Sequence, residues 1–466
     1  MDRLKPLDAM FIDAEDEDSN TSMAIASVAV FEGPTPSQQE LLEYYAGRLP
    51  LLPRYRQKLR AVPFRLARPV WVEDPDFDLG YHVRRTALPE PGTDQQLADL
   101  MARVMSARLD RDHPLWECWV VEGLCADRWA MISKVHHCLV DGISGTDLYR
   151  VLLGFSPEPA EPVDDDRVVR EEPSAATLLS EAATDTAWLM VQDSRVLTGA
   201  LAGALADPDR TVRQATDLGR AIARLWPSLR PAVKSSLTGQ IGQERRYAMA
   251  RASLDDIKLI KRELGGTVND VVLAAISGGF RELLLARGEQ PQAHQVPSLV
   301  PVSLRARGEE NTYENRVSAT VADLPVHIAN PVERLAAVRT ELESLKASNE
   351  AMVGEALTAL GGISPYPIAS WWVRTLFWLP QREIVTVTTN VPGPRQPLFC
   401  LGRRLEEIIP YVPIASRVRT GISILSYRDD VAFGITGDFT ANPDLEVLAR
   451  GIERGISELL RCARQA

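Results

Sequence analysis

Residues 129–142 read Trp-Ala-Met-Ile-Ser-Lys-Val-His-His-Cys-Leu-Val-Asp-Gly, an apolar run that ends in two histidines, an aspartate and a glycine. The run at 129–135 has the composition of a strand, and a similar run at 116–122 precedes it across a short polar turn. After Gly142 the apolar residues recur at helical spacing. The histidine pair is therefore predicted to follow a β-hairpin and precede a helix, where a rigid strand can hold side chains that face a site.

The spacing His-x-x-x-Asp at such a junction suits the activation of a hydroxyl group. A neutral imidazole, with an ordinary pKa of about 6.5, accepts a proton at neutral pH. We predict His137 as the general base, with His136 and Asp141 as further catalytic residues. Gly142 allows the chain to turn sharply, which lets Asp141 fold back toward a structural arginine. The local pattern alone leaves a purely structural role for the pair open.

Other chemistries find no support in the sequence. A zinc site lacks a third ligand at a recognisable spacing, since Cys138 beside His137 would point elsewhere on an extended chain. The order Gly-Ile-Ser-Gly at 142–145 is not that of a serine nucleophile elbow, and no phosphate-binding glycine loop is present. We therefore predict no metal and no cofactor.

Length and composition describe an ordinary soluble globular protein of two or three domains. Of the 466 residues, 45 % are hydrophobic and 25 % charged, and the net charge of −11 argues against nucleic acid as a partner. Five scattered cysteines, with no signal peptide and no membrane-spanning run, indicate reduced thiols in the cytoplasm. A local excess of Lys and Arg at 210–262 indicates either an anionic partner or a solvated helix face.

The pattern along the chain predicts an α/β protein with mixed sheets in three parts. Residues 1–155 form a first half, residues 156–246 a Pro- and acid-rich linker followed by a helical bridge, and residues 247–466 a second half. Helix starts are predicted at Ser253, Thr267 and Asn330. Further strands are predicted at 23–31, 299–304 and 384–389, a hairpin at 421–436, and a last helix through 445–459.

Six short blocks, in order along the chain, resemble the signatures of the bacterial wax ester synthase/acyl-CoA:diacylglycerol acyltransferases, and most closely the actinobacterial triacylglycerol synthases. Each block alone is modest, but six in order are highly specific. The blocks are Leu7-Asp8-Ala9-Met10-Phe11, Pro114-Leu115-Trp116-Glu117, the His-His-x-x-x-Asp-Gly at 136–142, Asn269-Asp270, Pro301-Val302-Ser303-Leu304-Arg305 and Asn390-Val391-Pro392-Gly393-Pro394.

The resemblance implies a fold similar to chloramphenicol acetyltransferase and to peptide-synthetase condensation domains. Two related α/β halves would meet at a channel, with the His-His loop near its middle and a mouth for each substrate. The implied reaction moves a long-chain acyl group from acyl-CoA, which is a substrate and not a cofactor, to diacylglycerol or to a fatty alcohol.

The resemblance also implies roles for individual residues. His137 takes the proton of the acceptor hydroxyl, which attacks the thioester directly, so Cys138 is not a nucleophile. His136 positions His137 or lines the channel. Asp141 holds the loop through a buried ion pair, for which Arg305 is one candidate partner.

Asn269 and Asn390 are both candidates to stabilise the oxyanion, and the choice between them stays open. Simpler interpretations also exist for three blocks. Asp270 can complete a capping box with Thr267, residues 114–116 can seat a core tryptophan, and residues 392–394 can form a rigid turn.

Because diacylglycerol resides in membranes, we predict peripheral attachment to the inner membrane face or to lipid droplets. An amphipathic helix around 218–226, with Arg220 and Arg224, is one candidate contact, although the protein's own core could cover the same face. The aromatic segment 371–379 is another, or else part of an acyl tunnel. Two rival functions remain: a condensation-type acyltransferase that needs a carrier protein, and a non-catalytic lipid-droplet protein.

Overall fold

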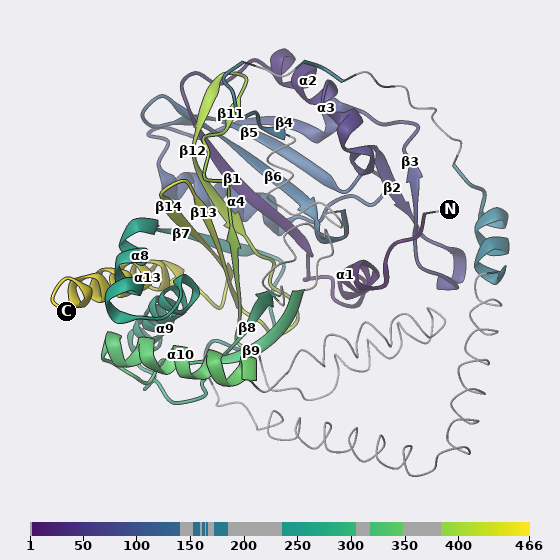
Figure 1. Ribbon diagram of the computed structural model, residues 1–466. Coiled ribbons are helices and arrows are strands. Elements are labelled where there is room, and N and C mark those ends of the chain that lie inside the picture. The colour runs from purple at the N-terminus through teal and green to yellow at the C-terminus, as the bar shows by residue number, and fades with distance from the viewer. Residues whose placement is uncertain are drawn as a thin grey trace, which may run out of the picture.

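The computed structural model contains two six-stranded sheets (Figure 1). Each sheet has its own hydrophobic core. The structure describes residues 2–139, 152–158, 161–163, 165, 172–184, 235–303, 317–347 and 384–466. In the first sheet the order is β11 (Phe399–Cys400), β12 (Arg403–Tyr411), β1 (Ala24–Glu32), β6 (Arg128–His136), β5 (Trp116–Leu124) and β4 (Val83–Ala87). In the second it is β7 (Arg245–Ser253), β14 (Asp430–Asp438), β13 (Thr420–Tyr427), β10 (Thr386–Pro392), β8 (Val296–Ser303) and β9 (Val317–Leu324).

The C-terminal half contributes strands to the first sheet. Strand β12 pairs antiparallel with β1, so β1 lies between β12 and β6. Behind β12 the second sheet comes very close, because a Cβ at Gly434 would lie only 1.6 Å from the carbonyl oxygen of Pro410. Tyr247 in β7 donates a hydrogen bond to the same oxygen at 2.6 Å. The two halves are thus interlocked through β12.

Helices cover the second sheet and connect it to the first. Helices α8 (Leu254–Leu264), α9 (Val268–Ala286), α10 (Pro331–Ala347) and α13 (Leu445–Ala463) pack together on one side of the second sheet (Figure 1). Helix α4 (Asp94–Ser106) lies against β7, where Ser106 accepts a hydrogen bond from the backbone N–H of Arg245 at 2.9 Å. Further elements of the described chain are α1 (Pro6–Glu17), α2 (Gln38–Ala46), α3 (Leu79–His82), the two-stranded sheet of β2 (Gln57–Arg60) and β3 (Val70–Glu73), and the 3-10 turns η1 (Leu49–Leu51), η2 (Pro53–Arg56), η3 (Pro63–Arg65) and η4 (His137–Leu139).

The locally encoded elements lie where the sequence predicts them. The predicted hairpin is β5–β6, and the second one is β13–β14. Ser253 and Thr267 cap α8 and α9 with their side chains, and the Asn330 side chain accepts from the first N–H groups of α10.

Some predictions lie outside the described residues, among them the helix after Gly142, most of the helical bridge, and the segments 218–226 and 371–379. The domain boundaries stay predictions. In the part of the chain that is described, no helix is both long and apolar enough to cross a bilayer.

Candidate active site

The ends of two strands fix the backbone of the histidine pair. Strand β6 ends at His136, whose N–H donates to the carbonyl of Leu115 at 2.9 Å. The N–H of His137 donates in the opposite direction, to the carbonyl of Met23 just before β1, at 3.1 Å. The chain then leaves the sheet through η4. Both histidines are therefore anchored before the chain turns.

The side chain of His136 is locked in a buried network. Its Nδ1 accepts from the backbone N–H of Cys138 at 3.2 Å and lies 2.9 Å from the Cys138 thiol. An acceptor Nδ1 leaves the ring proton on Nε2, which lies 3.3 Å from Oε1 of Glu15, short of ideal hydrogen-bond geometry. Burial raises the pKa of Glu15, but contacts from His136, Met23 and Arg111 outweigh it and lower that pKa to about 2. Glu15 is therefore an ionised acceptor that holds His136.

His137 points elsewhere and remains partly accessible. Its ring packs against the ring of Phe11, with centroids 4.1 Å apart and planes tilted by 34°. Burial, followed by the neighbouring His136, lowers the pKa of His137 from 6.5 to about 4. At neutral pH the imidazole is therefore uncharged and able to accept a proton, as a general base must be.

Helix α1 supplies both partners of the histidine pair. Phe11 and Glu15 are four residues apart, so they share one face of the helix, and α1 packs against η4. Arg111 holds that face by donating to Glu15 Oε2 at 3.0 Å and to Asp16 at 2.6 Å. The N-terminal block at 7–11 thus begins the helix that positions the site. Sequence reasoning missed Glu15 and Arg111, because their contacts with His136 and with each other form only in the folded chain.

Cys138 has the environment of an unreactive thiol. It is buried, and burial, aided by the nearby Asp8 and Glu15 carboxylates, raises its pKa well above the ordinary value. Its thiol lies 2.9 Å from Nδ1 of the His136 ring. These contacts support the prediction that Cys138 is not a nucleophile.

The block Pro114-Leu115-Trp116 is part of the core. The Trp116 indole is 2 % exposed, donates to the carbonyl of Tyr55 at 2.7 Å and stacks on His82 with centroids 4.5 Å apart. Its connection to the site is the Leu115 carbonyl that holds His136. The block therefore seats a tryptophan and aligns β5 with the end of β6.

The structure brings Asn269 and Asn390 together. The Nδ2 of Asn390, in β10, donates to Oδ1 of Asn269, at the start of α9, at 3.2 Å. Asp270 completes the capping box with Thr267 through bonds of 2.7 and 3.2 Å. Within the described ranges, no hydrogen bond or ring contact joins this asparagine pair to His137. Asp141, Gly142 and Arg305 lie outside the described residues.

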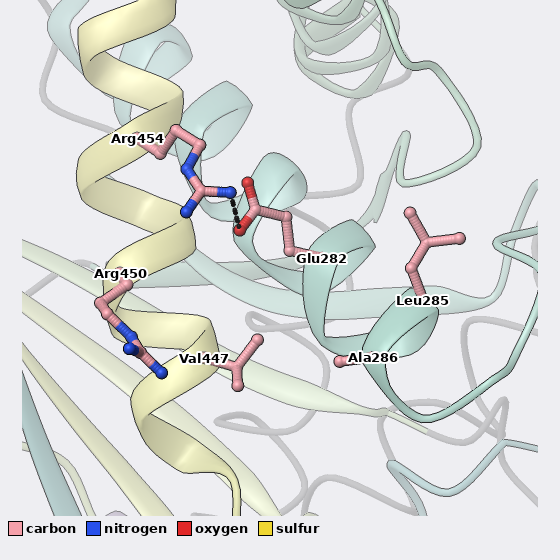
Figure 2. A pocket seen from close by; sticks show the side chains of 6 residues that line it. All are labelled: Glu282, Leu285, Ala286, Val447, Arg450 and Arg454. Atoms are coloured by element: carbon pink, nitrogen blue, oxygen red, sulfur yellow. Dashed lines mark ion pairs between the residues drawn. The ribbon is translucent and has the colours of Figure 1, made fainter.

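The described residues line two cavities of different size. A groove of about 430 Å³ between α9 and α13 is lined by Glu282, Leu285, Ala286, Val447, Arg450 and Arg454, and contains no predicted site residue (Figure 2). Arg454 and Glu282 pair across it at 3.2 Å. A smaller cavity of about 60 Å³ does touch the site, because Cys138 and Leu139 line it together with Asp8 and Trp71. Across the described residues, no three His, Cys, Asp or Glu side chains gather as a metal site would need.

Comparison with known proteins identifies the chain's relatives. The model of the wax ester synthase/diacylglycerol acyltransferase catalytic domain matches residues 4–272, and that of the C-terminal domain of the same enzymes matches residues 313–460. A Mycobacterium tuberculosis protein named as a diacylglycerol O-acyltransferase is 41 % identical over all 466 residues, which cover 97 % of that protein. A second one from the same organism is 33 % identical over 460 residues, which are 99 % of this chain and 91 % of that protein.

Solved structures confirm the predicted fold class. The wax ester synthase/diacylglycerol acyltransferase from Marinobacter aquaeolei VT8 superposes with a TM-score of 0.67 at 26 % identity, covering 99 % of this chain and 100 % of that one. The first condensation domain of the calcium-dependent antibiotic synthetase superposes with a TM-score of 0.56 at 14 % identity, covering 98 % and 95 %. The second match shows the fold alone, and it is the likeness to condensation domains that the family resemblance implied.

Proposed function

The chain belongs to the wax ester synthase/diacylglycerol acyltransferase family of enzymes, and we propose that it transfers a long-chain acyl group from acyl-CoA to diacylglycerol, forming triacylglycerol. The observation that carries the proposal is the uncharged His137, held at the end of β6 and packed on Phe11. Such a group can activate a hydroxyl without a metal or a cofactor. Fatty alcohols are a second candidate acceptor, favoured by the match to a structure named as a wax ester synthase.

The proposed reaction is a direct displacement. His137 takes the proton of the acceptor hydroxyl while the oxygen attacks the thioester carbon. The carbon–sulfur bond then breaks, and CoA leaves with the proton that His137 had accepted. No acyl-enzyme forms, in keeping with the buried, protonated thiol of Cys138.

Other residues take supporting roles in this proposal. Glu15 and His136 hold the turn that presents His137. Asp141 would keep the following loop in place, with Arg305 as a candidate partner. Asn269 and Asn390 stay candidates for the oxyanion donor. Because they share a hydrogen bond, a change at either one disturbs both, so their roles need a double-mutant cycle.

The pKa of His137 leads to an expected pH dependence. A general base works only when unprotonated, so activity is lost as pH falls through the pKa of the folded enzyme, about 4. We expect kcat/KM for the acceptor to stay level from neutral pH down to about pH 5 and to decline below that. The measurement is a pH–rate profile on protein whose folding is checked at each pH by circular dichroism. A decline centred on the ordinary histidine pKa of about 6.5 would show that the environment of His137 is not as described.

Product analysis tests the proposed function itself. Purified protein is incubated with labelled palmitoyl-CoA and a mixture of diacylglycerol and fatty alcohol, and the labelled lipids are separated. We expect triacylglycerol, with wax ester appearing if alcohols are also accepted. Transfer from free acyl-CoA would exclude a need for a carrier protein. Label found only in free palmitate or left on CoA would contradict the proposal.

The choice of diacylglycerol as the acceptor also bears on where in the cell the enzyme works. An enzyme that uses diacylglycerol must reach the lipid surface where diacylglycerol resides. We therefore include in the proposal peripheral attachment to the inner membrane face or to lipid droplets.

A further inference from the structure

The hairpin of β2 and β3 presents an apolar tip to solvent. Its strands pair from Gln57–Glu73 to Arg60–Val70, and the chain between them forms η3. At the tip, Phe64 is 86 % exposed and Leu66 is 41 % exposed. We propose that this tip, residues 61–67, inserts Phe64 and Leu66 into a membrane surface that carries anionic headgroups. The inference rests on the proposed function, because a bilayer-resident acceptor requires the enzyme to meet the bilayer.

The backbone at the tip is unfavourable for the residues it carries. Phe64 has φ 57° and ψ 12°, and Arg65 has φ 52°. Bulky side chains rarely adopt this left-handed conformation, which glycine and asparagine tolerate better. The exposed Phe64 ring has few contacts within the protein that could offset this strain. A strained, exposed aromatic side chain is explained if its stabilising contact is made outside the folded chain.

The charges around the tip match an anionic surface. Residues 54–68 contain six Lys and Arg and no Asp or Glu, and five of the six pair with carboxylates from other segments. Around the tip, the arginine side chains are more exposed than the carboxylates of Glu172 and Asp16, which are 28 % and 23 % exposed. Arg60 pairs with Glu172 and Arg65 with Asp16, yet 52 % and 56 % of these arginine side chains remain exposed. Two partly open guanidinium groups therefore flank the apolar tip, an arrangement that favours anionic lipid.

The hairpin is fastened to the segment that leads into the site. The N–H of Leu4 donates to Pro69 and the N–H of Trp71 donates to Asp2, both at 2.9 Å. The chain then enters α1, whose Phe11 packs on His137, and Figure 1 shows the hairpin beside this N-terminal segment. The cavity of about 60 Å³ lies between Trp71 of β3 and the η4 turn. Insertion of the tip would therefore bring the histidine side of the molecule to the membrane.

Vesicle binding by the full-length protein tests the inference. The vesicles are equimolar phosphatidylcholine and phosphatidylglycerol, with pure phosphatidylcholine for comparison, and binding is measured by flotation. We expect Phe64→Asn to weaken partition into the mixed vesicles roughly tenfold, because the buried apolar area of one phenyl ring is lost. Its Tm should be equal to or higher than that of the wild type, since asparagine accepts the left-handed conformation. Lower binding together with undiminished stability separates a contact with lipid from a structural role.

A matched control is Phe439→Ser, which removes a phenylalanine that is 40 % exposed on the second half of the molecule. It should leave vesicle binding unchanged. Wild-type binding by Phe64→Asn, an equal loss in Phe439→Ser, or no preference for the anionic vesicles would each overturn the inference. Triacylglycerol formation by the wild type from detergent-dispersed substrates is measured separately. Its absence would remove the proposed function, while the vesicle result would still decide the role of the tip.

Discussion

Replacement of His137 by alanine is expected to slow acyl transfer by roughly three orders of magnitude, the middle of the range for loss of a general base. Without the imidazole, no described side chain in contact with this position can take the hydroxyl proton, because its ring neighbour is Phe11 and the ring of His136 faces Glu15. The fold should be little affected, because the backbone bonds of residue 137 do not involve its ring.

The measurement is steady-state kinetics with acyl-CoA and diacylglycerol. We expect kcat to fall while KM for acyl-CoA changes little, since the base acts in the transition state and does not bind the donor. Cys138→Ala is the matched control, one residue further along, and should keep transfer within about tenfold of the wild type. Wild-type turnover by His137→Ala would refute both the base and the mechanism.

Replacement of Glu15 by alanine is expected to lower both stability and kcat. The change removes the buried acceptor of the Met23 N–H and the carboxylate that faces Nε2 of His136, and it leaves Arg111 paired with Asp16. Removal of one member of a buried charged network costs about 3 kcal/mol in the free energy of unfolding. The η4 turn loses the contact that holds His136, and a displaced His137 should lower kcat on the order of 10²-fold.

Glu15→Gln separates positioning from a general loss of structure. The amide oxygen can still accept from Met23 and His136, so most of the stability and an intermediate kcat should return, with the pH–rate profile of the wild type. Glu17→Gln, an exposed position on the same helix, should match the wild type in Tm and kcat. The positioning role would fail if Glu15→Ala kept full kcat, or if kcat did not recover in Glu15→Gln when Tm did.

Elements that depend on local signals could be predicted from the sequence. The β5–β6 hairpin has two apolar runs and a short turn, and α8 and α9 begin at residues whose side chains cap them. These signals act within a few residues, so tertiary contacts are not needed to interpret them. Asp270 illustrates the same point, because its capping bond was evident from its distance to Thr267 alone.

Strand β12 could not be predicted, because its pattern depends on distant partners. The sequence at 403–411 mixes charged and apolar residues without alternation, since β12 pairs with β1 of the other half while its Pro410 packs against the second sheet. The register with β1 joins residues more than 370 positions apart. A period-based interpretation cannot detect such a strand.

The sequence predicted only part of the site, because some of its contacts also join residues that are far apart along the chain. His137 carries a recognisable motif, and the structure adds the contact with Phe11 and the lowered pKa that keeps the imidazole uncharged at neutral pH. Glu15 could not be assigned, since its link to His136 spans 121 positions of the chain and is formed only when α1 packs on η4. The structure also gives His136 a definite environment. Its ring is buried, Nδ1 accepts from the N–H of Cys138 and Nε2 faces Glu15, an arrangement that favours positioning over catalysis.

A single-turnover experiment tests the central claim most directly. Enzyme in excess over labelled palmitoyl-CoA is mixed with diacylglycerol, and label is followed on CoA, on protein and in triacylglycerol, for the wild type and His137→Ala. We expect label to pass from CoA to triacylglycerol in the wild type with none bound to protein, and to stay on CoA in the variant. Covalently labelled protein on the path to triacylglycerol, or wild-type transfer by His137→Ala, would contradict direct displacement with His137 as the base.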